Sequence, residues 1–173
     1  MEKLFVFITA LIATNCFSQT GQKFSTFVSL HVNKTLYDND NYLHKSAIAG
    51  VGFQTLLNTK SRLKATLELT ADLFTVPNYG PADELLNPKK IIIPAIYVGP
   101  SFQLTDRIFI ATTVGTSIYT EQAHFGIRPS VEFYPSKKKY WAAKASFTNV
   151  FQEHTASNTK DFGYMSFGLN FRL

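Results

Sequence analysis

Residues 62–73 read Arg-Leu-Lys-Ala-Thr-Leu-Glu-Leu-Thr-Ala-Asp-Leu, in which polar and apolar side chains alternate without interruption. Because a β-strand sends successive side chains to opposite faces, the stretch predicts a strand with one apolar face and one polar, partly charged face. A strand of a water-soluble sandwich can show the same pattern. The stretch therefore predicts an all-β protein before it says where that protein resides.

The same two-residue period recurs in about eight segments along the chain. We expect strands at 23–33, 46–57, 62–73, 91–104, 108–118, 125–133, 141–151 and 162–173. Strands of globular proteins usually run about five or six residues, and these expected strands are longer. They suit tilted strands that cross a membrane, which need roughly nine to eleven residues.

The expected connections alternate in length along the chain. Three are short turns, at 58–61, 105–107 and 135–139, and four are mostly longer loops, at 34–45, 75–90, 120–124 and 152–161. Short turns on one side and longer loops on the other are typical of an outer-membrane barrel. Aromatic residues also collect near the strand ends, as in the interfacial girdles of such barrels. Those at the short-turn end are Phe102, Phe133, Tyr134, Tyr140, Trp141 and Phe171, and those at the loop end are Tyr37, Tyr42, Tyr119, Phe125 and Phe151.

The N-terminal segment, residues 1–18, has the pattern of a cleavable signal peptide. An apolar run from Leu4 to Ala13 follows Glu2 and Lys3, and the segment ends in the small residue Ser18. Such a run is too short to span a bilayer, so we expect cleavage and a mature barrel domain at 19–173. A retained membrane anchor is the alternative. Lipidation of Cys16 is another, although Asn15 is a poor residue to precede a lipidated cysteine.

The mature chain of about 155 residues suits a single domain. Its net charge stays at +5, but the basic residues are scattered, and an exported protein seldom meets nucleic acid, so we expect no nucleic-acid partner. Without a cysteine after residue 18, neither disulfides nor thiolate metal sites are available. The four histidines show no ligand spacing, so we expect no metal and no cofactor.

These residues resemble the small eight-stranded outer-membrane β-barrels of the OmpA/OmpX type, the outer membrane protein beta-barrel domain family. The most specific part is the ending Ser-Phe-Gly-Leu-Asn-Phe-Arg-Leu at 166–173, which looks like the signal that barrel-assembly machinery recognises. The residues that carry this likeness are Phe167, Gly168, Leu169, Phe171 and Leu173.

The resemblance implies an eight-stranded antiparallel up-and-down transmembrane β-barrel in the cell outer membrane, exported through the Sec pathway. It implies outer-membrane lipid, lipopolysaccharide and the assembly machinery as partners, and a monomer. Pro94, Pro100 and Pro129 fall within expected strands. Because proline cannot donate to a strand ladder, we expect bulges or water-accessible strand ends at these three positions.

If the apolar faces meet lipid, the opposite faces line the barrel interior. That set contains a group of charged residues that we expect to form a lumen network: Lys64, Glu68, Asp72, Arg128, Glu132 and Lys144. Across the 135–139 turn, Ser130 should oppose Lys144, with Glu132 and Arg128 in diagonal reach. The charges could line an ion pathway. Eight strands leave an interior that side chains just fill, which favours a salt-bridged plug.

We therefore expect a non-enzymatic barrel with a structural or binding role in its longer loops, chiefly 37–43 and 77–88. A narrow channel or small-solute transporter is the alternative. A lipid A-modifying enzyme is another, for which His124, Ser117 and Glu121 are the nearest set, although their spacing is that of no catalytic triad. A soluble sandwich or lipocalin-like binder remains as the alternative fold.

Overall fold

The structure is a computed structural model that describes residues 24–37, 48–58, 61–79, 85–119, 122–151 and 161–173. The predicted signal peptide at 1–18 lies outside these residues, as do most of the 37–43 loop and of the connection at 152–161. Within the described part of the chain, no helix is long and apolar enough to cross a membrane.

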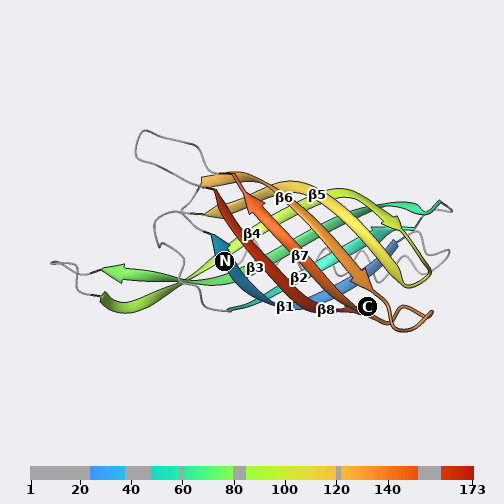
Figure 1. Ribbon diagram of the computed structural model, residues 1–173, viewed down its shortest axis with the longest axis horizontal. Helices are drawn as coiled ribbons and strands as arrows, with labels where there is room; N and C mark the ends of the chain where they lie inside the picture. Colours follow the sequence, from blue (N-terminus) through green and yellow to red (C-terminus); the bar gives the residue numbers. More distant parts are fainter. Residues whose placement is uncertain (1–23, 38–47, 59–60, 80–84, 120–121, 152–160) are drawn as a thin grey trace.

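The described residues form eight strands that close into one barrel (Figure 1). The strands are β1 (Phe24–Tyr37), β2 (Ile48–Leu57), β3 (Leu63–Tyr79), β4 (Leu85–Gln103), β5 (Ile108–Tyr119), β6 (Gln122–Phe133), β7 (Trp141–Val150) and β8 (Phe162–Arg172). Each strand pairs antiparallel with its neighbours in the chain, and β8 pairs with β1 to close the sheet. The predicted eight-stranded up-and-down barrel is confirmed.

The loop predicted at 75–90 is wrong, because most of it is strand. β3 continues to Tyr79 and β4 begins at Leu85, and the two pair beyond the barrel with one register shift between Val76 and Asn78. Figure 1 shows this hairpin in green, projecting past the loop end of the barrel. A hairpin pairs its own backbone groups, so it can extend without help from the other strands.

The loop predicted at 120–124 is also too long. β6 begins at Gln122, and its first pair is with Tyr119, the last residue of β5. Among the described residues, strands therefore leave only 120–121 between β5 and β6. The polar composition of this segment reflects its place at the end of a hairpin and not a missing strand pair.

Side-chain orientation follows the predicted alternation. On β3, Glu68 and Asp72 point inward and are 2% and 0% exposed, while Leu67 and Leu69 lie on the outer face. Large apolar side chains such as Ile92, Val98 and Phe167 are about half exposed on that outer face. A half-exposed apolar surface all around a closed sheet is the surface expected where lipid replaces water.

Tyr134 is an exception to the predicted aromatic girdle at the short-turn end. It follows the outward-facing Phe133 and therefore points inward, where it is fully buried and donates a hydrogen bond to Glu132 Oε2 at 2.7 Å. The prediction placed Tyr134 on the outer face because it grouped aromatic residues by their nearness to the strand ends and did not apply the inward–outward alternation.

The three prolines sit where the ladder needs no donor from them. Pro94 lies inside β4, paired with Ala71 of β3 and just beyond the last β4·β5 pair, Ala95 with Ser117, so the strand end predicted for it is wrong. Pro100 and Pro129 face outward, each inside a two-residue gap in a ladder.

The bulges predicted as one way to accommodate these prolines are absent from both gaps. The β4·β5 pairing stops at Val98 and resumes at Ser101 in the same register. The β6·β7 pairing likewise stops at Ile127 and resumes at Ser130 without a shift. A missing proline N–H thus interrupts the ladder locally and does not insert an extra residue.

Two aromatic clusters fill the two ends of the barrel interior. The short-turn cluster consists of Phe27, Leu56, Phe109, Tyr134 and Ala142. The loop-end cluster consists of Phe74, Ile93, Val150, Phe162 and Tyr164. Within them, ring centroids lie 5.2 Å apart for Phe109 and Tyr134 and 5.3 Å apart for Phe74 and Phe162. The interior polar residues occupy the layer between the clusters.

Candidate functional site

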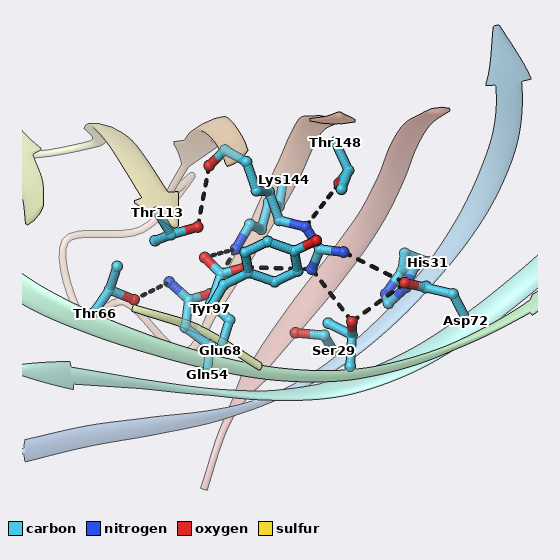
Figure 2. Close-up of polar contacts among 12 residues, drawn as sticks. Ser29, His31, Gln54, Thr66, Glu68, Asp72, Tyr97, Thr113, Lys144 and Thr148 are labelled. Atoms are coloured by element: carbon cyan, nitrogen blue, oxygen red, sulfur yellow. Dashed lines mark hydrogen bonds and ion pairs between the residues drawn. The ribbon is translucent and has the colours of Figure 1, made fainter. Parts of the chain in front are cut away.

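The layer between the two aromatic clusters holds five charged side chains, of which four are buried and Lys144 is partly buried. Glu68 and Asp72 come from β3, Arg128 and Glu132 from β6, and Lys144 from β7. All five sit at even positions, which the alternation turns inward on these three strands. Because β3 lies across the barrel from β6 and β7, the side chains meet in the middle of the lumen (Figure 2).

Lys144 joins the two sides of the barrel. Its Nζ lies 2.6 Å from Glu68 Oε1 and 3.4 Å from Glu132 Oε1, and it donates to Gln54 Oε1 at 3.3 Å. Gln54 Nε2 in turn donates to Glu132 Oε1 at 2.5 Å, and Asn170 donates to Gln54. One ammonium thus bridges two carboxylates, and a buried amide fills the remaining space.

The predicted pairing of Ser130 with Lys144 is wrong by two residues. Glu132 lies directly opposite Lys144, and Ser130 lies opposite Ser146. β7 begins its pairing with β8 at Trp141, two residues before it reaches β6. A shift of two preserves the inward direction of each side chain, so Lys144 and Glu132 still meet.

Arg128 occupies the other half of the network and is 3% exposed. Its Nη2 lies 3.4 Å from Asp72 Oδ2 and its Nη1 lies 3.7 Å from Glu68 Oε2. It also donates to Thr148 Oγ1 at 2.8 Å and to Tyr164 Oη at 2.7 Å. A buried guanidinium is tolerated only when its charge and its donors are satisfied in this way.

Asp72 contacts three further polar side chains through its two carboxylate oxygens. His31 Nε2 lies 2.5 Å from Asp72 Oδ1, Asn33 donates to the same oxygen at 2.7 Å, and Tyr164 donates to Oδ2 at 2.9 Å. His31 and Asp72 appear together at the right of Figure 2. Asn33 and Tyr164 were not in the predicted network, although their parity on β1 and β8 would have identified them as inward-facing.

The network accounts for five of the six predicted charged residues. Lys64 lies nearer the short turns, opposite Ser101 on β4. The charges described for the central layer are two cations, Arg128 and Lys144, against three carboxylates. His31 contacts one of these carboxylates, Asp72.

Little free volume remains in this layer. The described lumen contains a cavity of about 20 Å³, lined by residues that include Ser29, His31, Arg128 and Lys144. A cavity of this size holds about one water molecule. With the aromatic clusters at both ends, side chains fill much of the described interior.

Three residues were considered for the catalytic site of a lipid A-modifying enzyme, namely Ser117, Glu121 and His124. Ser117 and His124 lie directly opposite each other on β5 and β6, and both point inward. The Ser117 hydroxyl is hydrogen-bonded to the Tyr97 hydroxyl at 2.7 Å. Glu121 lies outside the described residues. The pairing of Ser117 with His124 brings a hydroxyl and an imidazole together on neighbouring strands.

The predicted assembly signal forms most of β8. Phe167, Leu169, Phe171 and Leu173 face outward, and Gly168 faces inward opposite His31 and Lys144. A side chain at Gly168 would collide with the backbone of Leu30 and the side chain of His31. Glycine is therefore required there by the close approach of β1, independently of any role in assembly.

Comparison with solved structures finds the same fold. Yersinia pestis outer membrane protein Ail in a phospholipid bilayer nanodisc matches with a TM-score of 0.57 at 10% identity, covering 86% of this chain and 99% of Ail. The crystal structure of Ail, the attachment invasion locus protein, gives 0.57 at 11%, covering 87% and 97%. A de novo designed transmembrane β-barrel gives 0.50 at 10%, covering 86% and 95%.

No protein-family model matches the chain, and no curated protein matches its sequence. Membership of the OmpA/OmpX family therefore stays a prediction. The closed barrel, the exposed apolar belt and the solved neighbours agree with one another. The chain has the fold of a small eight-stranded outer-membrane β-barrel, and its outward surface is that of a protein of the cell outer membrane.

Proposed function

We propose that the protein is a non-enzymatic outer-membrane barrel whose lumen does not conduct and whose role is binding at its loop end. The observation that carries this proposal is the filled lumen. Charged side chains neutralise one another across its middle, aromatic clusters occupy both ends, and the described cavity has room for about one water molecule. A barrel of this kind serves as a rigid support for the loops and the hairpin at its loop end.

The part best placed for display is the β3–β4 hairpin. Its strands run to Tyr79 and from Leu85, beyond the loop end of the barrel, and they remain paired with each other there. Loops and hairpins on a rigid scaffold are where binding usually occurs, because their sequence can vary without loss of the fold. The binding role predicted for residues 77–88 thus falls on a paired hairpin and not on an irregular loop.

Single-channel recording in planar bilayers tests the closed lumen. The wild-type protein should give no discrete conductance steps, because paired charged side chains and two aromatic clusters fill the described interior. Glu68→Ala with Lys144→Ala removes the central ion pair and should open a measurable leak, which serves as the positive control. Regular conductance steps from the folded wild-type protein would favour the narrow channel or transporter instead.

Replacing residues 77–88 by a two-residue Asn-Gly turn tests the binding role. Wild-type and shortened proteins, both shown to fold by a mobility change on boiling, would be compared for retention on heparin. Heparin is a reasonable first probe because Ail has been crystallised with the heparin analogue sucrose octasulfate. Mass spectrometry of lipid A from cells with and without the protein tests the enzymatic alternative, since any added or lost acyl group would contradict the proposal.

A further inference from the structure

The short-turn end of the barrel carries a concentration of positive charge. Seven cationic side chains lie in or beside its turns, and we call them the basic rim: Arg62, Lys64, Arg107, Lys137, Lys138, Lys139 and Arg172. Over the same described residues, Asp106 in the turns and Glu132 beside them are acidic, so the excess is five positive charges (seven minus two). The whole chain carries +5, so its charge excess is gathered at this end.

Backbone hydrogen bonds hold the turns of the basic rim beside one another. The Tyr134 N–H donates to the Arg107 carbonyl at 2.7 Å, and the Arg172 N–H donates to the Tyr140 carbonyl at 2.8 Å. The Arg62 carbonyl accepts in the same way from β4 at 2.9 Å. The backbone segments that carry these cations are therefore held together around one mouth of the barrel.

Lys139 shows how crowded these charges are. Its backbone adopts a φ of 53°, and its ammonium lies 4.4 Å from the Phe109 ring centroid, over the short-turn cluster. Burial lowers the pKa of Lys139, and the neighbouring Lys64 and Arg172 cations lower it further, whereas Asp106 raises it. A bound anion would relieve this repulsion among like charges.

The height of the basic rim along the barrel indicates what it meets. Exposed aromatic side chains surround the outer face at the same end, and in membrane barrels such rings sit at the headgroup level. These are Phe102, Phe133, Tyr140, Trp141 and Phe171. The turn cations lie immediately beyond this belt. Their position along the barrel is therefore that of the lipid phosphates, which favours a lipid headgroup over a soluble anion.

We propose that the basic rim binds the headgroups of anionic phospholipids in the leaflet at the short-turn end. Arg107, Lys137 and Lys138 are exposed and supply the outer contacts, while Lys139 and Arg172 present charge from the mouth. Each Lys or Arg near an anionic membrane surface contributes roughly a fivefold preference. Several cations acting together should therefore select anionic lipid strongly over zwitterionic lipid. The site is at the opposite end from the loops, and it does not depend on what they bind.

Trp141 provides a probe, because it is the only tryptophan in the chain and lies at the rim, 40% exposed. The folded protein would be reconstituted in vesicles that mix phosphatidylglycerol and phosphatidylcholine. One lipid at a time carries brominated chains, which quench tryptophan at close range. The ratio of the two quenching curves gives the relative affinity of the rim for the anionic lipid. We expect at least about a fivefold preference for phosphatidylglycerol.

The test variant is Arg107→Gln with Lys137→Gln and Lys138→Gln, which removes the outer cations without touching the lumen network. Its preference should fall below half the wild-type value. Lys34→Gln is the matched control, because Lys34 is an exposed cation on β1 near the loop end, and it should keep the full preference. Arg107 and Lys138 make their described hydrogen bonds through backbone groups and not through their side chains, so the triple variant should fold.

The wild-type protein also provides a test that needs no variant. Raising the salt from about 0.05 M to about 0.5 M shortens the screening length severalfold, so the preference should fall. Three outcomes would overturn the proposal. They are a wild-type preference below fivefold, a preference that salt leaves unchanged, and a triple variant that keeps more than half of the wild-type value.

Discussion

Replacing Lys144 by methionine should destabilise the barrel by about 3–5 kcal/mol, because it leaves two buried carboxylates without their shared cation. Lys144 Nζ lies 2.6 Å from Glu68 and 3.4 Å from Glu132. At an effective dielectric of about 20, these separations correspond to attractions of about 6 and about 5 kcal/mol before desolvation. Glu132 also accepts hydrogen bonds from Gln54 and Tyr134, so it should depend less on Lys144 than Glu68 does.

Two double-mutant cycles separate these contributions. One combines Lys144→Met with Glu68→Gln, and the other combines it with Glu132→Gln. The coupling free energy should be larger with Glu68, by about 1 kcal/mol, since the ammonium lies closer to that carboxylate. Stability would be measured by urea unfolding in lipid vesicles, followed by Trp141 fluorescence.

Lys138→Met is the matched control, because Lys138 is an exposed turn residue and its loss should leave the unfolding midpoint unchanged. The reasoning would be refuted if both cycles were additive, since the ion pairs would then contribute nothing to stability. A larger coupling with Glu132 would show that the pair across the β6·β7 ladder, and not the contact across the lumen, holds the network together.

Three other changes test separate parts of the structure. Leu67→Arg on the outer face of β3 should cost about 2–4 kcal/mol of stability near the bilayer midplane, whereas Leu67→Val should unfold near the wild-type urea concentration. Gly50→Ala should lower the unfolding midpoint by the equivalent of about 1–3 kcal/mol, because its methyl group would collide with His31 and Asp72; an unchanged midpoint would mean that this contact can relax. Deleting residues 170–173 removes β8 residues that pair with β1, so the heat-modifiable folded form should disappear from the outer-membrane fraction, and its persistence would count against barrel closure by β8.

The strands and their faces could be predicted because the two-residue period is visible wherever lipid and lumen impose opposite chemistry. Leu67 and Glu68 are adjacent and lie on opposite sides of the barrel wall, as the alternation required. The β3–β4 hairpin beyond Thr75 was missed because its sequence lacks the regular two-residue alternation of the other strands. Pro77 and Asn78 then resemble a loop.

The lumen network could be predicted as a set but not as contacts. Parity identified the charged residues that point inward, and it also placed Asn33 and Tyr164 inward, although neither was chosen. The contact between Lys144 and Glu68 depends on which strands face each other across the closed barrel, and on their stagger. Stagger is set by the pairing of all eight strands together, so no local stretch of sequence encodes it.

The gaps near Pro100 and Pro129 weaken two of the eight strand pairings that form the barrel wall. The β5·β6 ladder is continuous from Ile108 with Phe133 to Tyr119 with Gln122, whereas the ladders on either side of it are interrupted near Pro100 and Pro129. The β5–β6 hairpin is thus joined to its neighbours, β4 and β7, by two interrupted ladders of hydrogen bonds. Among the strand pairings, amide hydrogen exchange should be fastest in β4·β5 and β6·β7, and these two pairings should separate first when the barrel opens.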